Sequence, residues 1–275
     1  MKFQSQVEKP VHRGKLRKKA GKEYFILKRK LDWLFSSKKY ARIHSQITYP
    51  HTYIKHKSLL LRPLKDVDMY LQHNKITNLR LAIEKINGVV IHPNETFSIW
   101  KMVGRPTKQK GYLEGLVLDN GTISKGIGGG LCQLGNLLFW MVLHTPLTIT
   151  ERWRHSYDVF PDVNRSIPFG CGATLSYNYV DFQFKNETDR PFKINLWLDD
   201  QFLHGNITSD KKSENEYKIV ETGHLIQMQW WGGYTRHNKI CKEITNLNTK
   251  EKSEEIVCEN HAIMMYNPVL TQSTE

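Results

Sequence analysis

The chain has 275 residues and a mass of 32.2 kDa, with 39% hydrophobic and 24% charged residues. This composition excludes a collagenous, coiled-coil, disulfide-dense or wholly disordered protein, and no apolar run approaches the roughly 20 residues of a membrane-spanning helix. The formal net charge of +13 lies at the amino terminus, because residues 1–65 carry 18 Lys and Arg against three Asp and Glu. Such asymmetry indicates an anionic partner, or else a solvated segment that only aids solubility.

Residues 1–65 form a basic amino-terminal segment that contains the pattern of an amphipathic helix. Its apolar positions recur at intervals of three and four residues, opposite a cationic face: Tyr24, Leu27, Leu31, Leu34 and Phe35. Two interpretations stay open. The helix lies on an anionic membrane surface with Trp33 and Phe35 at the level of the headgroups, or it docks on the protein's own body.

Residues 66–205 have the pattern of a mixed domain, which we expect to be the core. A helix is expected over 66–87, with Gly88 as its carboxy-terminal cap, and Val89–Ile91 predicts a short buried strand. Asp119-Asn120-Gly121 predicts a hairpin, since Asn-Gly accepts positive φ. Further strands are expected at 147–152, 173–180, 182–185 and 192–198.

The most unusual segment is Gly126–His144, where a glycine-rich loop precedes an apolar stretch that ends before Pro146. We expect a buried helix that begins near Cys132. The predicted fold class is α+β, in which the glycine-rich loop leads to a buried central helix packed on a mostly antiparallel sheet. Residues 206–275 are strand-like and predict a β-rich carboxy-terminal extension, with a loop or linker at 211–216.

Cys132 is the best candidate nucleophile. Gly128, Gly129 and Gly130 let the backbone approach another group closely. A thiol at the start of a helix meets unsatisfied N–H groups and the positive end of the helix dipole, which lower its pKa and favour the thiolate. The competing interpretation is that Cys132 is a small buried hydrophobic residue.

A nucleophilic thiol requires a base, and His155 follows the predicted strand at 147–152. The order of a helix-borne Cys and a strand-borne His is that of papain-like and transglutaminase-like hydrolases. Asp181 is a candidate to orient His155, and Gln133 is a candidate to stabilise an oxyanion. Most histidines in a chain of this size are structural, so the dyad is a hypothesis.

Arg152 and Arg154 are candidate substrate-binding residues, because a pair of arginines near a helix start can bind a carboxylate or phosphate. Salt bridges to Asp158 or Asp162 are the alternative. Trp230 and Trp231 precede two glycines and are candidates for a sugar or peptide platform, with core or interface packing as the alternative.

The sequence shows no known cofactor motif. It lacks a P-loop, a dinucleotide fingerprint, a Cys-x-x-Cys pair and the His-Glu-x-x-His motif, so we expect no cofactor and no metal. Four scattered cysteines and the absence of an apolar leader-like region predict reduced thiols in the cytoplasm. The basic segment lacks the pattern of a known nucleic-acid-binding module, so nucleic acid is not expected as a partner.

Several blocks of the chain resemble the VanW family. The match begins near Phe97-Ser98 and strengthens at Gly126–Gln133. The family core covers roughly residues 90–205, and a closer similarity to one member extends to about 270. The other matching blocks are Val103–Thr107, Gly111-Tyr112, Arg154–Ser156, Gly172–Thr174 and Asp181-Phe182. The Gly-Gly-Gly-x-Cys-Gln block with these flanks is specific to that family.

The resemblance implies a role beside glycopeptide resistance, in which cell-wall precursors ending in D-alanyl-D-lactate replace those ending in D-alanyl-D-alanine. The family has no settled biochemical activity, and the core resistance chemistry does not require it. Its motif points to Gly128, Gly129, Gly130, Cys132, Gln133 and His155. The chain departs from many members at Gly135-Asn136, where they have Ser or Thr, and at Gly172, where they have Asp.

The predicted function is therefore an accessory protein of glycopeptide resistance and cell-wall metabolism that binds or acts on peptidoglycan precursors through the Gly-Gly-Gly-Leu-Cys-Gln block. The alternative is a Cys-His hydrolase or acyl transferase acting on a peptidoglycan-related amide or ester. The expected partners are a cell-wall precursor or the peptidoglycan-synthesis machinery, together with an anionic membrane surface that residues 1–65 would contact. The expected location is the cytoplasm, with peripheral association at the inner membrane face.

Overall fold

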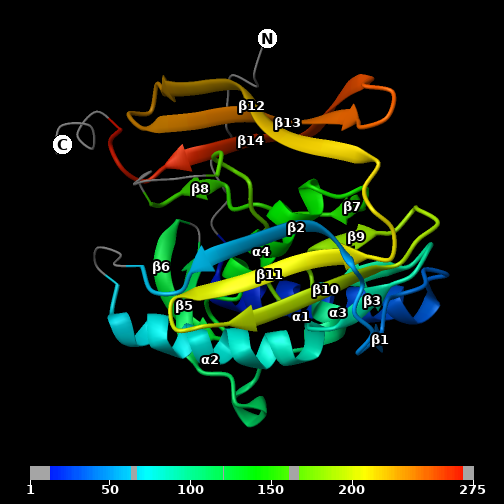
Figure 1. Cartoon of the computed structure of the whole chain (residues 1–275). Helices are drawn as coiled ribbons and strands as arrows, with labels where there is room; N and C mark the ends of the chain where they lie inside the picture. The colour runs from blue at the N-terminus through cyan, green and yellow to red at the C-terminus, as the bar shows by residue number, and fades with distance from the viewer. Residues whose placement is uncertain (1–12, 63–66, 120, 161–166, 269–275) are drawn as a thin grey trace.

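The computed structural model describes residues 13–62, 67–119, 121–160 and 167–268, and it has the predicted α+β fold (Figure 1). Residues 1–12 and 63–65 of the basic segment, Asn120 of the predicted hairpin turn, and Asp162 lie outside the described residues. The helices are α1 (Lys15–Phe35), α2 (Met69–Ile86), α3 (Ile99–Val103), α4 (Cys132–Leu143) and the short 3₁₀ helix η1 (Lys108–Lys110).

Within the described ranges, the strands form four sheets. The largest has the order β1-β3-β10-β11-β2 with all neighbours antiparallel: β1 (Ile43–His44), β3 (Val89–Ile91), β10 (Phe192–Leu198), β11 (Phe202–Ser209) and β2 (His51–Leu59). A second antiparallel sheet contains β4 (Thr96–Ser98), β9 (Gln183–Lys185) and β7 (Thr148–Glu151). The predicted hairpin is formed by β5 (Glu114–Asp119) and β6 (Thr122–Ile127).

The carboxy-terminal extension is β-rich, as predicted. Its long antiparallel strands are β12 (Asn215–Met228), β13 (Tyr234–Asn246) and β14 (Lys252–Met264), and β8 (Tyr157–Asp158) adds to β14 in parallel. This sheet lies over the core at the top of Figure 1. Lys242 Nζ donates to the carbonyl of Thr145 at 3.0 Å, and Asn238 Nδ2 donates to the carbonyl of Phe169 at 2.6 Å. These bonds join the extension to the core.

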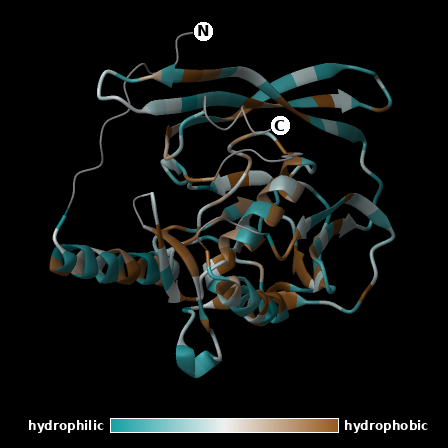
Figure 2. Ribbon diagram, turned by 90° about the vertical axis from the view of Figure 1, so that its left-hand side faces the viewer, coloured by the Kyte–Doolittle hydropathy of each residue, from teal (hydrophilic) through white to brown (hydrophobic). Residues whose placement is uncertain are grey.

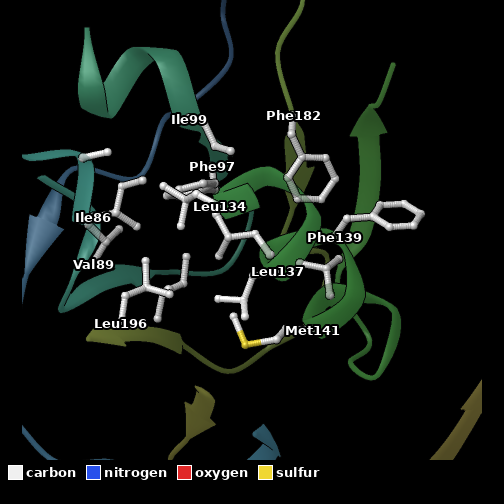
Figure 3. Close-up of a cluster of buried hydrophobic side chains, with 14 of the residues drawn as sticks. Ile86, Val89, Phe97, Ile99, Leu134, Leu137, Phe139, Met141, Phe182 and Leu196 are labelled. Carbon is white, nitrogen blue, oxygen red and sulfur yellow. The ribbon is translucent and has the colours of Figure 1, made fainter. Parts of the chain in front are cut away.

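Helix α4 is the centre of the core. It begins at Cys132, as predicted, and packs on β2 and β11, while α2 contacts β10 and β5. Leu134, Leu138 and Phe139 have no exposed surface, as expected for a mostly apolar helix in the core. Figure 3 shows side chains of α2, β3, α3, α4 and β10 meeting in this cluster. Each buried Leu or Phe side chain contributes about 1.5–3 kcal/mol by its removal from water.

The strand predicted at 173–180 was wrong. Residues 171–175 form no strand, and a turn closed by a bridge between Ser176 and Val180 follows. The segment 173–175 instead directs its N–H groups to side chains of α4 and to the carbonyl of Trp153. The apolar residues that suggested a strand serve this packing, which short sequence patterns do not reveal.

Helix α1 docks on the protein's own body, but not by the predicted stripe. Ile26 is buried and Trp33 packs against the core, whereas the predicted stripe is exposed. Trp33 therefore does not lie beside Phe35 on an outward face. β1 and β2 also fall within residues 1–65 and belong to the largest sheet. Among the described residues, no helix has the length and hydropathy needed to cross a bilayer.

Candidate functional site

The glycine-rich turn approaches another backbone closely, as predicted, and that backbone is the chain's own strand β5. Gly128 and Gly130 have φ values of 75° and 91°, which glycine adopts at little cost. A Cβ on Gly129 would lie 2.2 Å from the carbonyl carbon of Gly115. The buried Asn78 fixes this contact, because its Nδ2 donates to the carbonyl of Gly129 at 2.9 Å.

Two polar side chains hold the turn to the end of β2. Gln133 Nε2 donates to Ser58 Oγ at 2.9 Å and to the carbonyl of Leu59 at 2.8 Å. Lys75 Nζ donates to the carbonyl of Leu60 at 2.6 Å, and a Cβ on Gly130 would lie 2.3 Å from Lys75 Cγ. Burial lowers the pKa of Lys75 to about 8. The predicted oxyanion residue Gln133 thus has backbone and hydroxyl partners in the fold.

Cys132 lies at the first turn of α4, and its sulfur accepts the backbone N–H of Leu175 at 3.4 Å. One helical turn later, Asn136 Oδ1 accepts the N–H of Ala173 at 2.9 Å. The intervening Thr174 N–H donates to the carbonyl of Trp153 at 2.8 Å. The segment 173–175 therefore lies between α4 and Trp153, with alternate N–H groups directed to opposite sides.

Burial raises the pKa of the Cys132 thiol, against our expectation that the helix start would lower it. The desolvation of the thiolate outweighs the favourable dipole and the N–H of Leu175. His155 makes no hydrogen bond with any described residue, and burial together with the charge of Arg154 lowers its pKa. No hydrogen bond joins Cys132 to His155 within the described residues, so the catalytic dyad stays a prediction.

Asp181 is fully buried and belongs to a polar cluster between β4 and β9. Its carboxylate accepts from Ser98 Oγ at 2.5 Å, from Gln183 Nε2 at 3.0 Å and from the N–H of Trp100 at 3.2 Å. Burial raises the pKa of Asp181 to about 6. Its partners within the described residues do not include His155, so the orienting role of Asp181 also stays a prediction.

Sequence reasoning missed the ion pair beside Asp181. Glu151 accepts two hydrogen bonds from the Arg29 guanidinium of α1, at 2.5 and 2.7 Å. Gln183 Nε2 bonds to both carboxylates, since it also donates to Glu151 at 3.0 Å. A cavity of about 550 Å³ opens beside this pair, lined by Arg29, Leu31, Asp32, Trp33, Phe35, Ser36, Lys38, Tyr40, Glu151 and Gln183. No spacing in the sequence links Arg29 to Glu151.

The two predicted arginines have different surroundings. Arg152 Nε donates to the carbonyl of Gly172 at 2.9 Å, and its Nη2 donates to Asn260 Oδ1 at 3.1 Å, which connects the core to β14. The Arg154 guanidinium lies 3.9 Å from the ring centroid of Phe169. Arg236 covers the same ring at 4.1 Å. The substrate-binding role of both arginines stays a prediction.

The tryptophan pair lies at the tip of the β12–β13 hairpin, and its two rings have different environments. Trp230 is 88% exposed, whereas the Trp231 ring packs over Gly233, where a Cβ would lie 2.0 Å from Cζ3. Gln229 N–H donates to the carbonyl of Gly233 at 2.7 Å and closes the turn. Trp230 is therefore the more exposed ring of the pair, and the substrate-binding role of both tryptophans stays a prediction.

Comparisons with known proteins decide the family. Residues 74–208 match the family described as VanW like protein. The chain is 36% identical over 212 residues to the Vancomycin B-type resistance protein VanW of Enterococcus faecalis (strain ATCC 700802 / V583). The aligned residues make up 77% of each of the two chains. The chain belongs to the VanW family.

A second relative supports the same assignment. The VanW-family chain is 37% identical over 120 residues to the uncharacterized protein YoaR of Bacillus subtilis (strain 168), covering 42% of this chain and 37% of YoaR. No solved structure was found to match the chain. Within the parts that the structure describes, no three His, Cys, Asp or Glu side chains are grouped as metal ligands.

The two departures of this chain from the VanW-family pattern are in contact. A Cβ on Gly172 would lie 2.4 Å from Asn136 Oδ1, so Asn136 occupies the space that a side chain at position 172 would need. The same Asn136 Oδ1 accepts the backbone N–H of Ala173. A side chain at position 172 would therefore require the Asn136 amide to shift away from Ala173.

Proposed function

We propose that this VanW-family chain is an accessory protein of glycopeptide resistance that binds a peptidoglycan precursor around the amino-terminal turn of α4. The observation that carries the proposal is the similarity to the Vancomycin B-type resistance protein VanW along 77% of both chains. The Gly128–Gln133 turn lies within the region that matches the family. The proposed place of action is the inner face of the cytoplasmic membrane, where such precursors are made.

Binding rather than thiol catalysis is favoured by the surroundings of Cys132. Its sulfur accepts the Leu175 N–H, and burial raises its pKa, so the thiolate that a hydrolase or acyl transferase needs is disfavoured at neutral pH. The alternative is a Cys132–His155 enzyme that acts on a peptidoglycan-related amide or ester. One observation supports it. Cys132 does lie at the first turn of a buried helix.

The test is complementation of a strain whose B-type resistance cluster lacks its own VanW. We expect the wild-type chain to raise both the inhibitory concentration of vancomycin and the fraction of precursors that end in D-alanyl-D-lactate, measured by mass spectrometry. Unchanged values at equal protein level would contradict the proposal.

Variants at Cys132 separate binding from catalysis in the same strain. Cys132→Ser keeps an acceptor for the Leu175 N–H, and we expect it to complement as the wild type does. Loss of complementation in both Cys132→Ser and Cys132→Ala, with both proteins folded and equally abundant, would favour the enzyme instead.

A further inference from the structure

Helix α1 is fixed to the body by one face only. Ile26 is its buried residue, and Arg29 is bonded to Glu151 on β7. Glu23 pairs with Arg105 at 2.7 Å, and the Phe25 ring lies 6.1 Å from that of Tyr179. These contacts orient the helix about its own axis, so the direction of its remaining side chains is determined.

The opposite side of α1 is an outward apolar stripe. The stripe residues and their exposed fractions are Leu16 (85%), Tyr24 (62%), Leu27 (57%), Leu31 (46%), Leu34 (74%) and Phe35 (79%). At about 100° per residue these positions share one side of the helix, turned away from Ile26, Arg29 and Trp33. Figure 2 shows hydrophobic and hydrophilic residues mixed along α1 at the lower left, where its amino-terminal end extends away from the sheets. Soluble proteins rarely leave so many large apolar side chains together in water.

Cationic side chains flank the apolar stripe. The helix contains eight Lys and Arg against two acidic residues, and one of these acids, Glu23, is paired with Arg105. The exposed cationic side chains of the helix are Lys15, Arg17, Lys18, Lys19, Lys22, Lys28 and Lys30. A stripe of leucine and aromatic residues bordered by lysines is the pattern of a helix that lies in the interface of a membrane.

We propose that α1 binds a bilayer that contains anionic phospholipid, with the apolar stripe inserted at the level of the acyl chains. Anionic headgroups attract the flanking lysines, and the leucines lose their contact with water. A nucleic acid would require cations, not leucines, at the centre of the contact. Because Arg29 and Ile26 fix the helix to the body, the cavity bounded by Leu31, Trp33 and Phe35 would be held next to the lipid surface.

The inference goes beyond the proposed function and does not depend on it, since the test contains no cell-wall precursor. The full chain is mixed with phosphatidylcholine vesicles that contain or lack phosphatidylglycerol, and binding is measured by flotation at low and high salt. We expect binding to the phosphatidylglycerol vesicles, weakened by salt. No binding to these vesicles at low salt, or binding to duplex DNA in their place, would overturn the proposal.

A matched pair of variants tests the stripe itself. Leu27 and Ile256 on β14 are 57% and 59% exposed, so Leu27→Glu and Ile256→Glu make similar changes at two surfaces. We expect Leu27→Glu to lower the vesicle partition coefficient by about tenfold or more, and Ile256→Glu by less than about twofold. Circular dichroism checks that both variants fold.

Equal effects of the two variants on vesicle binding would overturn the proposal. So would a dimer in sedimentation that Leu27→Glu dissociates while vesicle binding is unchanged, because the stripe would then contact a second copy of the chain.

Discussion

Gly129 is the residue whose replacement should disturb the glycine-rich turn most. A Cβ there would lie 2.2 Å from the backbone of Gly115 on β5. The contacting atoms belong to the backbone, so they cannot move aside as the end of a flexible side chain would. We expect Gly129→Ala to lower the free energy of unfolding by about 1–3 kcal/mol or more, measured by denaturant titration.

Gly21→Ala on α1 is the control for this substitution. A Cβ at Gly21 meets nothing within 4 Å, so the same change should stabilise the helix by about 0.5–1 kcal/mol. Equal unfolding midpoints for Gly129→Ala and the wild type would show that the turn is not packed as described.

The raised pKa of Cys132 predicts slow reaction of its thiol. Only the thiolate is alkylated, so we expect little modification of Cys132 at pH 7 and a rate that increases only above the ordinary thiol pKa of about 9. Iodoacetamide labelling read by peptide mass spectrometry measures this, with the protein in denaturant as the reference. Faster labelling in the native protein at pH 7 would contradict it and revive the enzyme alternative.

Asp181 should make stability depend on pH in a defined direction. Its pKa in the folded chain is raised from 3.8 to about 6, so the folded state holds the proton more tightly than the unfolded state. The stabilisation is complete below the ordinary pKa and is lost as the pH rises through about 6. Between pH 4 and 6 we expect the wild type to lose up to about 3 kcal/mol of unfolding free energy relative to Asp181→Asn. A constant difference between the two proteins across this range would refute the prediction.

For single residues, the sequence predicted where the candidate site lies better than it predicted the chemistry of its side chains. It predicted that α4 begins at Cys132, because the glycines and the apolar run mark that boundary. It did not predict the raised thiol pKa, because burial of the sulfur depends on Leu175, which packs on α4 from 43 positions further along the chain.

Among the elements, α1 is held to the body in part by one half-buried ion pair. Arg29 donates two hydrogen bonds to Glu151, and both side chains are less than one-fifth exposed. We expect Arg29→Ala to cost α1 about 1–2 kcal/mol of local stability, which would raise hydrogen-exchange rates over 15–35 about tenfold.

The control for this variant is Lys28→Ala, the preceding exposed residue of the same helix. Identical exchange in Arg29→Ala and Lys28→Ala would mean that the ion pair does not hold the helix in place.

The amphipathic pattern predicted that α1 exists but not which of its sides faces the body. Periodicity identifies an apolar stripe, and the usual expectation is that such a stripe is buried. Here Ile26, Arg29 and Trp33 pack inward, and the leucines are exposed. Which side of α1 faces inward is determined by the positions of Glu151 and of the neighbouring core residues. Neither position can be predicted from the sequence of the helix alone.

For the whole molecule, the α+β class and the β-rich extension were confirmed, but the composition of the largest sheet was not foreseeable. β2 comes from the basic segment and pairs with β11, about 150 positions away in the sequence. Such long-range pairing leaves no local pattern. The same pairing places Ser58 and Leu59 beside Gln133, so the candidate site itself contains residues from the basic segment.

The central claim is that this VanW-family chain binds a cell-wall precursor, and direct titration tests it. The full chain would be titrated with an acylated peptide ending in D-alanyl-D-lactate and with its D-alanyl-D-alanine counterpart, followed by calorimetry and by NMR shifts. We predict saturable binding of the first peptide, with shifts concentrated at residues 128–136 and 172–175. Absence of binding to either peptide, or shifts confined to segments remote from α4, would contradict the account.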